Sequence, residues 1–158
     1  MPGAKNEVSS DRAMSMDELR TLFPALSRDA VETSPQDDSY NCVAWAGGDT
    51  ERSWWPASFP THGTHWPIPA TDETVEGFVE AFRALGYEAC DDGSLEKGFE
   101  KVALYVDAEG QPTHLVRQLS SGKWTSKMGR LEDIEHQSTE ELCGRSYGVV
   151  ERYMKRRA

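Results

Sequence analysis

Residues 100–128, EKVALYVDAEGQPTHLVRQLSSGKWTSKM, contain three apolar runs separated by two turn-forming segments. The runs at 100–107, 113–119 and 123–128 include many β-branched and aromatic residues, which favour strands. The two segments between them combine glycine with proline or serine, as tight turns do. This stretch therefore predicts an antiparallel meander of three strands.

Helical signals precede the meander. Apolar residues at helical spacing predict a helix over 72–85, with Gly86 at its C-terminal cap position. Two shorter helices are expected over 15–23 and 42–46. Helices followed by a meander predict an α+β fold, with N-terminal helices packed on a small antiparallel sheet.

The remaining segments give weaker signals. Residues 87–90 fit a short strand, and residues 133–136 and 140–142 are interpreted as helical. Residues 147–154 fit a last strand and a last helix equally well.

Composition limits the class of protein. The length of 158 residues and the 37% hydrophobic content indicate one globular domain, expected over 15–158 after a flexible segment at 1–14. A net charge of −10 argues against nucleic-acid binding, which needs clustered Lys and Arg. Runs of about 18 apolar residues, which a membrane span needs, are missing. The first residues lack the apolar stretch of a signal peptide, so we expect a cytoplasmic protein.

Cys42 is the candidate nucleophile. The three cysteines have neither the number nor the spacing of a disulfide framework. Cys42 follows turn-forming residues and opens a short apolar helix, where a helix N-terminus and a nearby imidazolium would lower the thiol pKa from about 8.5. Cys90 and Cys143 are interpreted as small buried hydrophobic residues.

His114 is the candidate base, because it is the only histidine within a predicted strand. A two-residue loop at 121–122 would place residue 114 opposite residue 129, so that His114 shares a face with Thr125 and Lys127. The alternative is a strand-end histidine that is hydrogen-bonded or solvated. Three residues on or just after the adjoining strand could orient the imidazole: Thr125, Ser126 and Asp133.

Other residues could complete such a site. The backbone N–H of Cys42 faces any carbonyl that the thiolate attacks, and a side-chain amide from Gln36 or Asn41 could complete an oxyanion hole. Asn41 is equally suited to cap the helix. The proline-rich segment 54–69 supplies three tryptophans that could wall a substrate cleft or cap the core: Trp54, Trp55 and Trp66.

Metal and cofactor motifs are missing from the sequence. His62 and His65 lie in a proline-rich loop rather than on a helix, without the Cys-x-x-Cys or His-Glu-x-x-His patterns of zinc sites. The chain also lacks a glycine-rich phosphate-binding loop and a Gly-x-Ser-x-Gly motif. We therefore expect neither a metal nor a cofactor.

Several segments together resemble a family of uncharacterised bacterial proteins: YNCVAWA at 40–46, WWP at 54–56, LGY at 85–87, FEKVALY at 99–105, TH at 113–114, RQL at 117–119 and GKWTSK at 122–127. The resemblance covers roughly residues 35–154 and implies no particular activity. More remotely, a cysteine on a helix followed by a histidine on a strand is similar to the papain-like and NlpC/P60-like thiol hydrolases, which would imply a fold of that type.

Only Cys42 and His114 match the scheme of those hydrolases, which use a Cys–His pair and a third polar residue. The Asp-Cys-Ser-Gly start of NlpC/P60 enzymes is missing. Papain-like proteases place an oxyanion-hole glutamine six residues before the cysteine, which is where Gln36 stands in this sequence.

Two functional hypotheses follow. In the first, the chain is a cysteine-dependent hydrolase or acyl-transfer enzyme of the peptidase, amidase or deamidase type, acting on a protein or peptide-like substrate. Cys42 attacks a carbonyl, and His114 takes the thiol proton and later protonates the leaving group. In the second, the chain is a non-catalytic protein-binding module that uses the segment 54–69, and Cys42 is a core residue.

Overall fold

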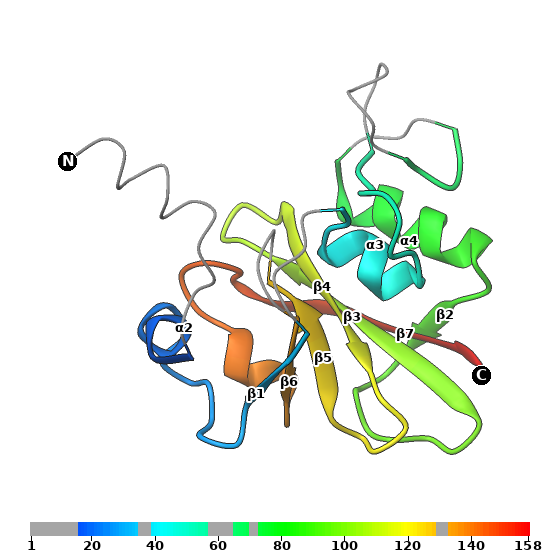
Figure 1. Cartoon of the computed structure of the whole chain (residues 1–158). Coiled ribbons are helices and arrows are strands. Elements are labelled where there is room, and N and C mark those ends of the chain that lie inside the picture. Colours follow the sequence, from blue (N-terminus) through cyan, green and yellow to red (C-terminus); the bar gives the residue numbers. More distant parts are fainter. Residues whose placement is uncertain (1–15, 35–38, 57–64, 70–72, 129–132) are drawn as a thin grey trace.

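The computed structural model describes residues 16–34, 39–56, 65–69, 73–128 and 133–158. In these ranges the chain forms a seven-stranded antiparallel sheet in the order β1-β6-β5-β4-β3-β7-β2 (Figure 1). The strands are β1 (Val31–Ser34), β2 (Glu88–Cys90), β3 (Phe99–Val106), β4 (Pro112–Gln118), β5 (Trp124–Lys127), β6 (Asp133–His136) and β7 (Val149–Arg157). The helices are α2 (Met16–Leu22), α3 (Cys42–Gly47), α4 (Val75–Ala84) and the 3-10 helix η1 (Thr139–Leu142).

The predicted meander is the centre of this sheet. β3, β4 and β5 are consecutive neighbours, as the pattern of apolar runs and turns indicated. The α+β composition is also confirmed. The expected arrangement of N-terminal helices on a small sheet is wrong. Strands on both sides extend the meander, and α3 and α4 come between β1 and β2 in the chain.

Two apolar cores lie on opposite faces of the sheet, because successive strand residues point to opposite sides. Val102, Leu104 and Leu115 pack with buried residues of α3 and α4. The alternate residues of β3 and β4 pack with Leu19 of α2 and with Leu142 of η1. Figure 1 shows α3 and α4 side by side, away from α2. We call the two sides the α3 face and the α2 face.

The register between β4 and β5 differs by one residue from the prediction. Gln118 pairs with Trp124, and Arg117 pairs with Thr125. The loop has three residues rather than two, since the Leu119 N–H donates to the Lys123 carbonyl at 2.8 Å. Gly122 ends that loop with φ of 92°, a conformation that glycine adopts readily.

This shift reverses the faces of β5. A one-residue slip exchanges the two sides of a strand. Thr125 and Lys127 therefore lie on the α3 face with Leu115, and Ser126 lies on the α2 face with His114. The prediction that His114 shares a face with Thr125 and Lys127 is wrong.

The segments after the meander also differ from expectation. Residues 133–136, interpreted as helical, form β6 and pair with both β5 and β1. Their buried residues alternate too poorly for sequence periodicity to distinguish a strand from a helical turn. Residues 139–142 form the short helix η1, and the undecided last segment is the strand β7 between β3 and β2.

The three predicted helices are present with slightly different ends, as is common for helix termini. Thr74 caps α4, because its hydroxyl accepts a hydrogen bond from the Gly77 N–H at 3.1 Å. The predicted flexible segment 1–14 lies outside the described residues. Among the described helices, none has the length and apolar character needed to cross a membrane.

Candidate functional site

Asn41 organises the start of α3. Its side-chain oxygen accepts hydrogen bonds from the Ala44 and Trp54 N–H groups, both at 3.0 Å. Its amide nitrogen donates to the Trp54 carbonyl at 2.8 Å. Of the two roles considered for Asn41, capping the helix is therefore the one observed, and the same side chain ties residue 54 to the helix. Gln36, the other candidate for the oxyanion hole, lies outside the described residues.

Cys42 is the first residue of α3 and is buried. Burial raises the pKa of the Cys42 thiol, and this effect outweighs the backbone N–H groups of Leu115, Val43 and Cys42 and the charge of Lys127, which favour the thiolate. The sequence predicted a lowered pKa at this position. That prediction is wrong in this state, since the nearby donors do not compensate for the water that the sulfur has lost.

Cys42 belongs to the helix that packs against β4, and it shares a buried core with Leu115 of that strand. Within the described ranges, β4 pairs with β5 only at Arg117 and Gln118, so its first half is open on that side. The backbone N–H of Leu115 favours the Cys42 thiolate. Leu115 directly follows His114, so both candidate residues lie near the same segment of β4, Cys42 in the core of the α3 face and His114 on the α2 face.

The imidazole of His114 is buried on the α2 face. Its ring stacks on the ring of Tyr147 at 3.9 Å between centroids and lies 5.7 Å from the ring of Tyr105. Burial, with a contribution from the charge of His136, lowers the pKa of His114 to about 3, so the ring is neutral at pH 7. Its Nε2 atom is buried without a hydrogen-bond partner among the described residues.

Tyr147 is a functional candidate that sequence reasoning missed. Burial, followed by the charge of the Cys42 sulfur, raises the pKa of its phenol. The same side chain stacks on His114, so Tyr147 is in range of both candidate groups. Its position at the start of the undecided segment 147–154 gave no sequence signal for this role.

The three residues proposed to orient His114 are divided between the faces. Ser126 shares the α2 face with His114, but its hydroxyl is hydrogen-bonded to His136 Nε2 at 2.8 Å. Thr125 and Asp133 lie on the α3 face, and Asp133 accepts a hydrogen bond from the Tyr40 hydroxyl at 3.0 Å. The register of β5 therefore directs Thr125 and Asp133 away from the His114 side of the sheet.

A buried polar cluster on the α3 face was also missed. Lys127 is fully buried, and its Nζ lies 5.1 Å from the centroid of the Tyr40 ring. Asp133 stands directly opposite Lys127 in the sheet and is also buried. Tyr40 precedes Cys42 by two residues. A lysine in a short polar strand gives no sequence signal of burial, because lysine is seldom fully buried.

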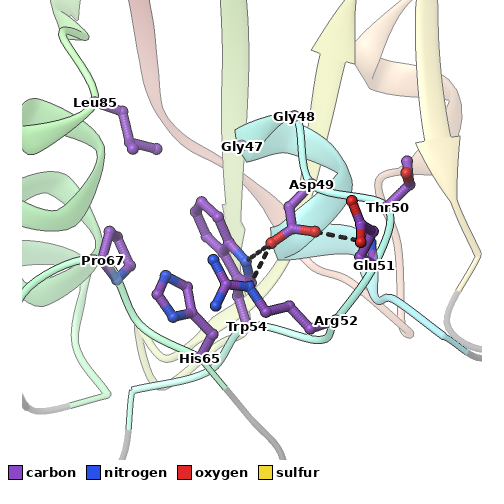
Figure 2. Close-up of a pocket in the computed structure, with 10 residues that line it drawn as sticks. All are labelled: Gly47, Gly48, Asp49, Thr50, Glu51, Arg52, Trp54, His65, Pro67 and Leu85. Atoms are coloured by element: carbon purple, nitrogen blue, oxygen red, sulfur yellow. Dashed lines mark hydrogen bonds and ion pairs between the residues drawn. The ribbon is translucent and has the colours of Figure 1, made fainter.

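A pocket of about 720 Å³ lies at the other end of α3 (Figure 2). The Asp49 carboxylate organises it by accepting hydrogen bonds from the Glu51 N–H, Arg52 Nε and Trp54 Nε1, each at 2.8 Å. Although burial opposes them, these hydrogen bonds lower the pKa of Asp49 to about 2. The pocket is lined by Gly47, Gly48, Asp49, Thr50, Glu51, Arg52, Trp54, His65, Pro67 and Leu85.

The predicted aromatic wall is only partly at this pocket. Trp54 lines it and packs edge-on against His65, with ring centroids 5.3 Å apart. Trp55 and Trp66 instead pack against Phe78 of α4, at 5.5 and 5.0 Å between centroids. Trp55 also donates a hydrogen bond from its indole to Glu73 at 2.7 Å. Trp55 and Trp66 thus cap the core on the α3 face.

The described residues contain no cluster of three or more His, Cys, Asp or Glu side chains that could hold a metal ion. Burial, with the charge of Arg52, lowers the pKa of His65, which packs on Trp54. His62 lies outside the described residues.

A family model described as a domain of unknown function, DUF7689, matches residues 31–155. The chain belongs to this family. The DUF7689 match includes α3, β4 and the pocket, and it agrees with the resemblance to an uncharacterised family. Comparison with curated proteins and with solved structures gives no match.

In this DUF7689 domain, contacts within the segment 40–56 explain several of its residues. Asn41 caps α3 and anchors Trp54, and Asp49 binds the Trp54 indole. A Cβ atom at Gly47 would stand 2.5 Å from the Trp54 ring, so the close approach requires glycine. The segment 40–56 is thus a structural unit that fixes the position of Cys42 at the start of the helix.

Proposed function

We propose that this DUF7689 chain is a cysteine-dependent hydrolase or acyl-transfer enzyme of the peptidase, amidase or deamidase type. Cys42 is the nucleophile, and His114 is the general base. The observation that carries the proposal is the Nε2 of a buried, neutral imidazole, which has no hydrogen-bond partner among the described residues and lies one residue from Leu115, a member of the core that contains Cys42. A buried nitrogen without a hydrogen-bond partner costs stability, so it calls for an explanation, and accepting a proton is the one we propose.

The resting charges define the mechanism. Burial raises the pKa of Cys42 and lowers that of His114, so both groups are neutral at pH 7. The reaction therefore begins from a thiol and an imidazole rather than from a preformed ion pair. As the sulfur attacks the carbonyl carbon, a C–S bond forms and the thiol proton passes to His114 Nε2.

The second half of the reaction returns the proton. The imidazolium protonates the leaving amine or thiol as the bond to the carbonyl carbon breaks, which leaves an acyl group on Cys42. Water, or an acceptor amine in the transfer reaction, then attacks the acyl carbon while His114 takes its proton. Breaking the C–S bond restores the thiol, so the cycle consumes only substrate and the second nucleophile.

The order of the two residues supports this proposal. A cysteine at a helix start followed by a histidine on a central strand is similar to the papain-like and NlpC/P60-like scheme, and the helix packs against that strand. The departure is Tyr147, which stacks on the imidazole where that scheme would have a polar third residue.

The test is acyl capture from a broad set of activated substrates. The chain is incubated with a panel of peptide phenyl thioesters and fluorogenic peptide amides, and the mass of each cysteine peptide and the release of product are followed. We expect an acyl group on Cys42, loss of turnover in Cys42→Ala, and at least about a hundredfold slower turnover in His114→Gln. Cys90→Ser is the matched control and keeps full activity. Equal turnover by Cys42→Ala would refute the proposal.

The second candidate function is a non-catalytic binding module, and the pocket of about 720 Å³ beside Trp54 favours it. In this function the ligand contacts Trp54, His65 and Arg52, and Cys42 serves only the core. Titration of a tetrapeptide library would shift the Trp54 indole NMR signal equally in the wild type and in Cys42→Ala. If the chain turns over peptides of the library while the Trp54 indole signal stays unchanged, this function is excluded.

A further inference from the structure

We propose that the pocket at the C-terminal end of α3 binds a carboxylate that is attached to an apolar group, and that Arg52 is the residue that binds the carboxylate. This inference rests on the second candidate function, the binding of a ligand beside Trp54, and it names the chemical class of that ligand. It is independent of the chemistry proposed for Cys42.

Asp49 supports this pocket and is itself occupied. Its Oδ1 accepts a hydrogen bond from the Glu51 N–H, and its Oδ2 accepts hydrogen bonds from Arg52 Nε and Trp54 Nε1, each at 2.8 Å. The side chain of Asp49 is 15% exposed, against 55% for the side chain of Arg52. The carboxylate of Asp49 therefore binds donors of the protein, while the guanidinium group of Arg52 stays open to a ligand.

Arg52 uses only one of its nitrogen donors within the described part of the chain. Its Nε donates to Asp49, and neither Nη atom donates a hydrogen bond to a described residue. Arg156 differs, because its Nε donates to Glu100 and its Nη1 donates to the Leu85 carbonyl. Since the guanidinium group is planar and rigid, the hydrogen bond from Nε to Asp49 fixes the direction of the two Nη atoms. Their N–H groups match the two oxygens of a carboxylate.

Two aromatic side chains are held beside this guanidinium group. Trp54 donates its indole N–H to the same carboxylate oxygen as Arg52, and the centroid of the His65 ring lies 5.3 Å from that of Trp54. The His65 N–H donates to the Ser53 carbonyl at 2.9 Å, and the His65 carbonyl accepts from the Trp55 N–H at 3.0 Å. Figure 2 shows the Arg52 side chain turned towards both rings. Backbone and side-chain hydrogen bonds therefore preform the site in the free chain.

The charges of the pocket limit the class of anion. Burial lowers the pKa of His65, so its imidazole is neutral at pH 7. Arg52 is therefore the one cation among the described residues that line the pocket. The carboxylates of Asp49 and Glu51 belong to the same lining, and they repel a multiply charged anion such as phosphate more strongly than a single carboxylate. These charges favour a monoanion.

Apolar groups form another part of the wall. Pro67 and Leu85 line the pocket together with Trp54. In Figure 2 Pro67 and Leu85 lie on the side away from Glu51 and Thr50. A ligand whose carboxylate contacts Arg52 places its apolar group against this wall, where the burial of apolar surface adds to the affinity.

The experiment is an NMR titration of the Trp54 indole signal in the full chain. The three probes are N-acetyl-alanyl-leucine, its C-terminal amide and 4-methylpentanoate. We expect both carboxylates to shift the signal to saturation, and the amide to bind at least tenfold more weakly than the dipeptide acid. Arg52→Gln should weaken the binding of both carboxylates at least tenfold and leave the binding of the amide unchanged. Arg145→Gln is the matched control, since it removes an exposed cation outside the pocket lining, and it should leave all three affinities unchanged.

The comparison of the two acids identifies the source of the carboxylate. Tenfold tighter binding of the dipeptide acid than of 4-methylpentanoate supports a peptide C-terminus, and binding that is no tighter supports a small free acid. If Arg52→Gln does not fold, Arg52→Lys decides, because it keeps the charge and loses the paired N–H groups, and it should bind both acids more weakly than the wild type.

The remaining outcomes separate this inference from the function on which it rests. Equal affinity for the dipeptide acid and its amide overturns the carboxylate class, while binding at the pocket stands. Unchanged affinity for the acids in the Arg52 variants overturns the role of Arg52. A Trp54 signal that none of the three probes shifts overturns the inference together with the second candidate function.

Discussion

Gly47→Ala tests whether the segment 40–56 is a rigid unit. In the structure, a Cβ atom at residue 47 would lie 2.5 Å from Trp54 Cζ3 and 2.6 Å from Cη2. The Trp54 ring cannot move away easily, because Asn41 is hydrogen-bonded to the N–H and the carbonyl of Trp54, and Asp49 accepts a hydrogen bond from the indole. One of these contacts must break or the helix must shift.

The expected cost follows from two opposing effects. Inserting a methyl group into a closely packed site costs about 3 kcal/mol at the upper end of the usual range. Alanine within a helix gains about 1 kcal/mol over glycine. The net loss of about 2 kcal/mol corresponds to a fall in Tm of about 4–8 °C for a chain of this size.

The assay is urea unfolding with thermal unfolding on the same samples, and Gly47→Ala is compared with a double variant that also carries Trp54→Leu. The smaller side chain at residue 54 leaves room for the added methyl group. Alanine at position 47 should therefore cost nothing, or stabilise the chain, in the Trp54→Leu background. The reasoning fails if Gly47→Ala alone is as stable as the wild type, or if its cost is equal in both backgrounds.

Three further predictions concern the site. Asn41→Ala removes a helix cap and both hydrogen bonds to the Trp54 backbone, so we expect the free energy of urea unfolding to fall by about 2–3 kcal/mol. An exposed control such as Ser121→Ala should lose less than about 1 kcal/mol, and equal losses in the two variants would contradict this account. Burial holds the pKa of His114 at about 3 in the folded chain, below its unfolded value of about 6.5. This depressed pKa contributes stability that is complete above pH 6.5 and is lost as the pH falls towards 3. The free energy of unfolding at pH 4.5 should therefore be about 2–3 kcal/mol lower than at pH 7, and His114→Asn should lack this difference. Parallel pH profiles for the two chains would exclude a contribution from His114. Iodoacetamide at pH 7.5 should label the half-buried Cys90 and Cys143 before the buried Cys42 in the free chain; first labelling at Cys42 would show that its thiol is more exposed and more acidic than described.

The sequence predicted the parts of the fold that local patterns determine. The apolar runs and turn residues of 100–128 identified the central hairpins, and the helical spacing of residues 75–85 identified α4. The neighbouring residues Gly47 and Gly48 marked the end of α3. These signals depend on residues close together in the chain, and tertiary contacts did not override them.

The site was harder to predict, since it depends on register and on distant segments. One extra residue in the loop before Lys123 exchanged the faces of Thr125 and Ser126. Tyr147 contacts His114 from a segment more than thirty residues away, which no local pattern reports. The pKa of Cys42 was misjudged for a similar reason: its position at a helix start is visible in the sequence, but the burial that dominates its pKa is not.

The order of the strands has a consequence for how the chain is made on the ribosome. β7 is the last of the seven strands in the chain, yet it pairs between β3 and β2, which are synthesised earlier. While residues 107–148 are being added, which takes roughly 2–8 s at about 5–20 residues per second, the outer edge of β3 has no partner. During that interval the nascent β3–β4 hairpin presents an open hydrogen-bonding edge to other chains. Slow translation of this stretch should therefore increase aggregation, and supply of β7 as a separate peptide should reduce it.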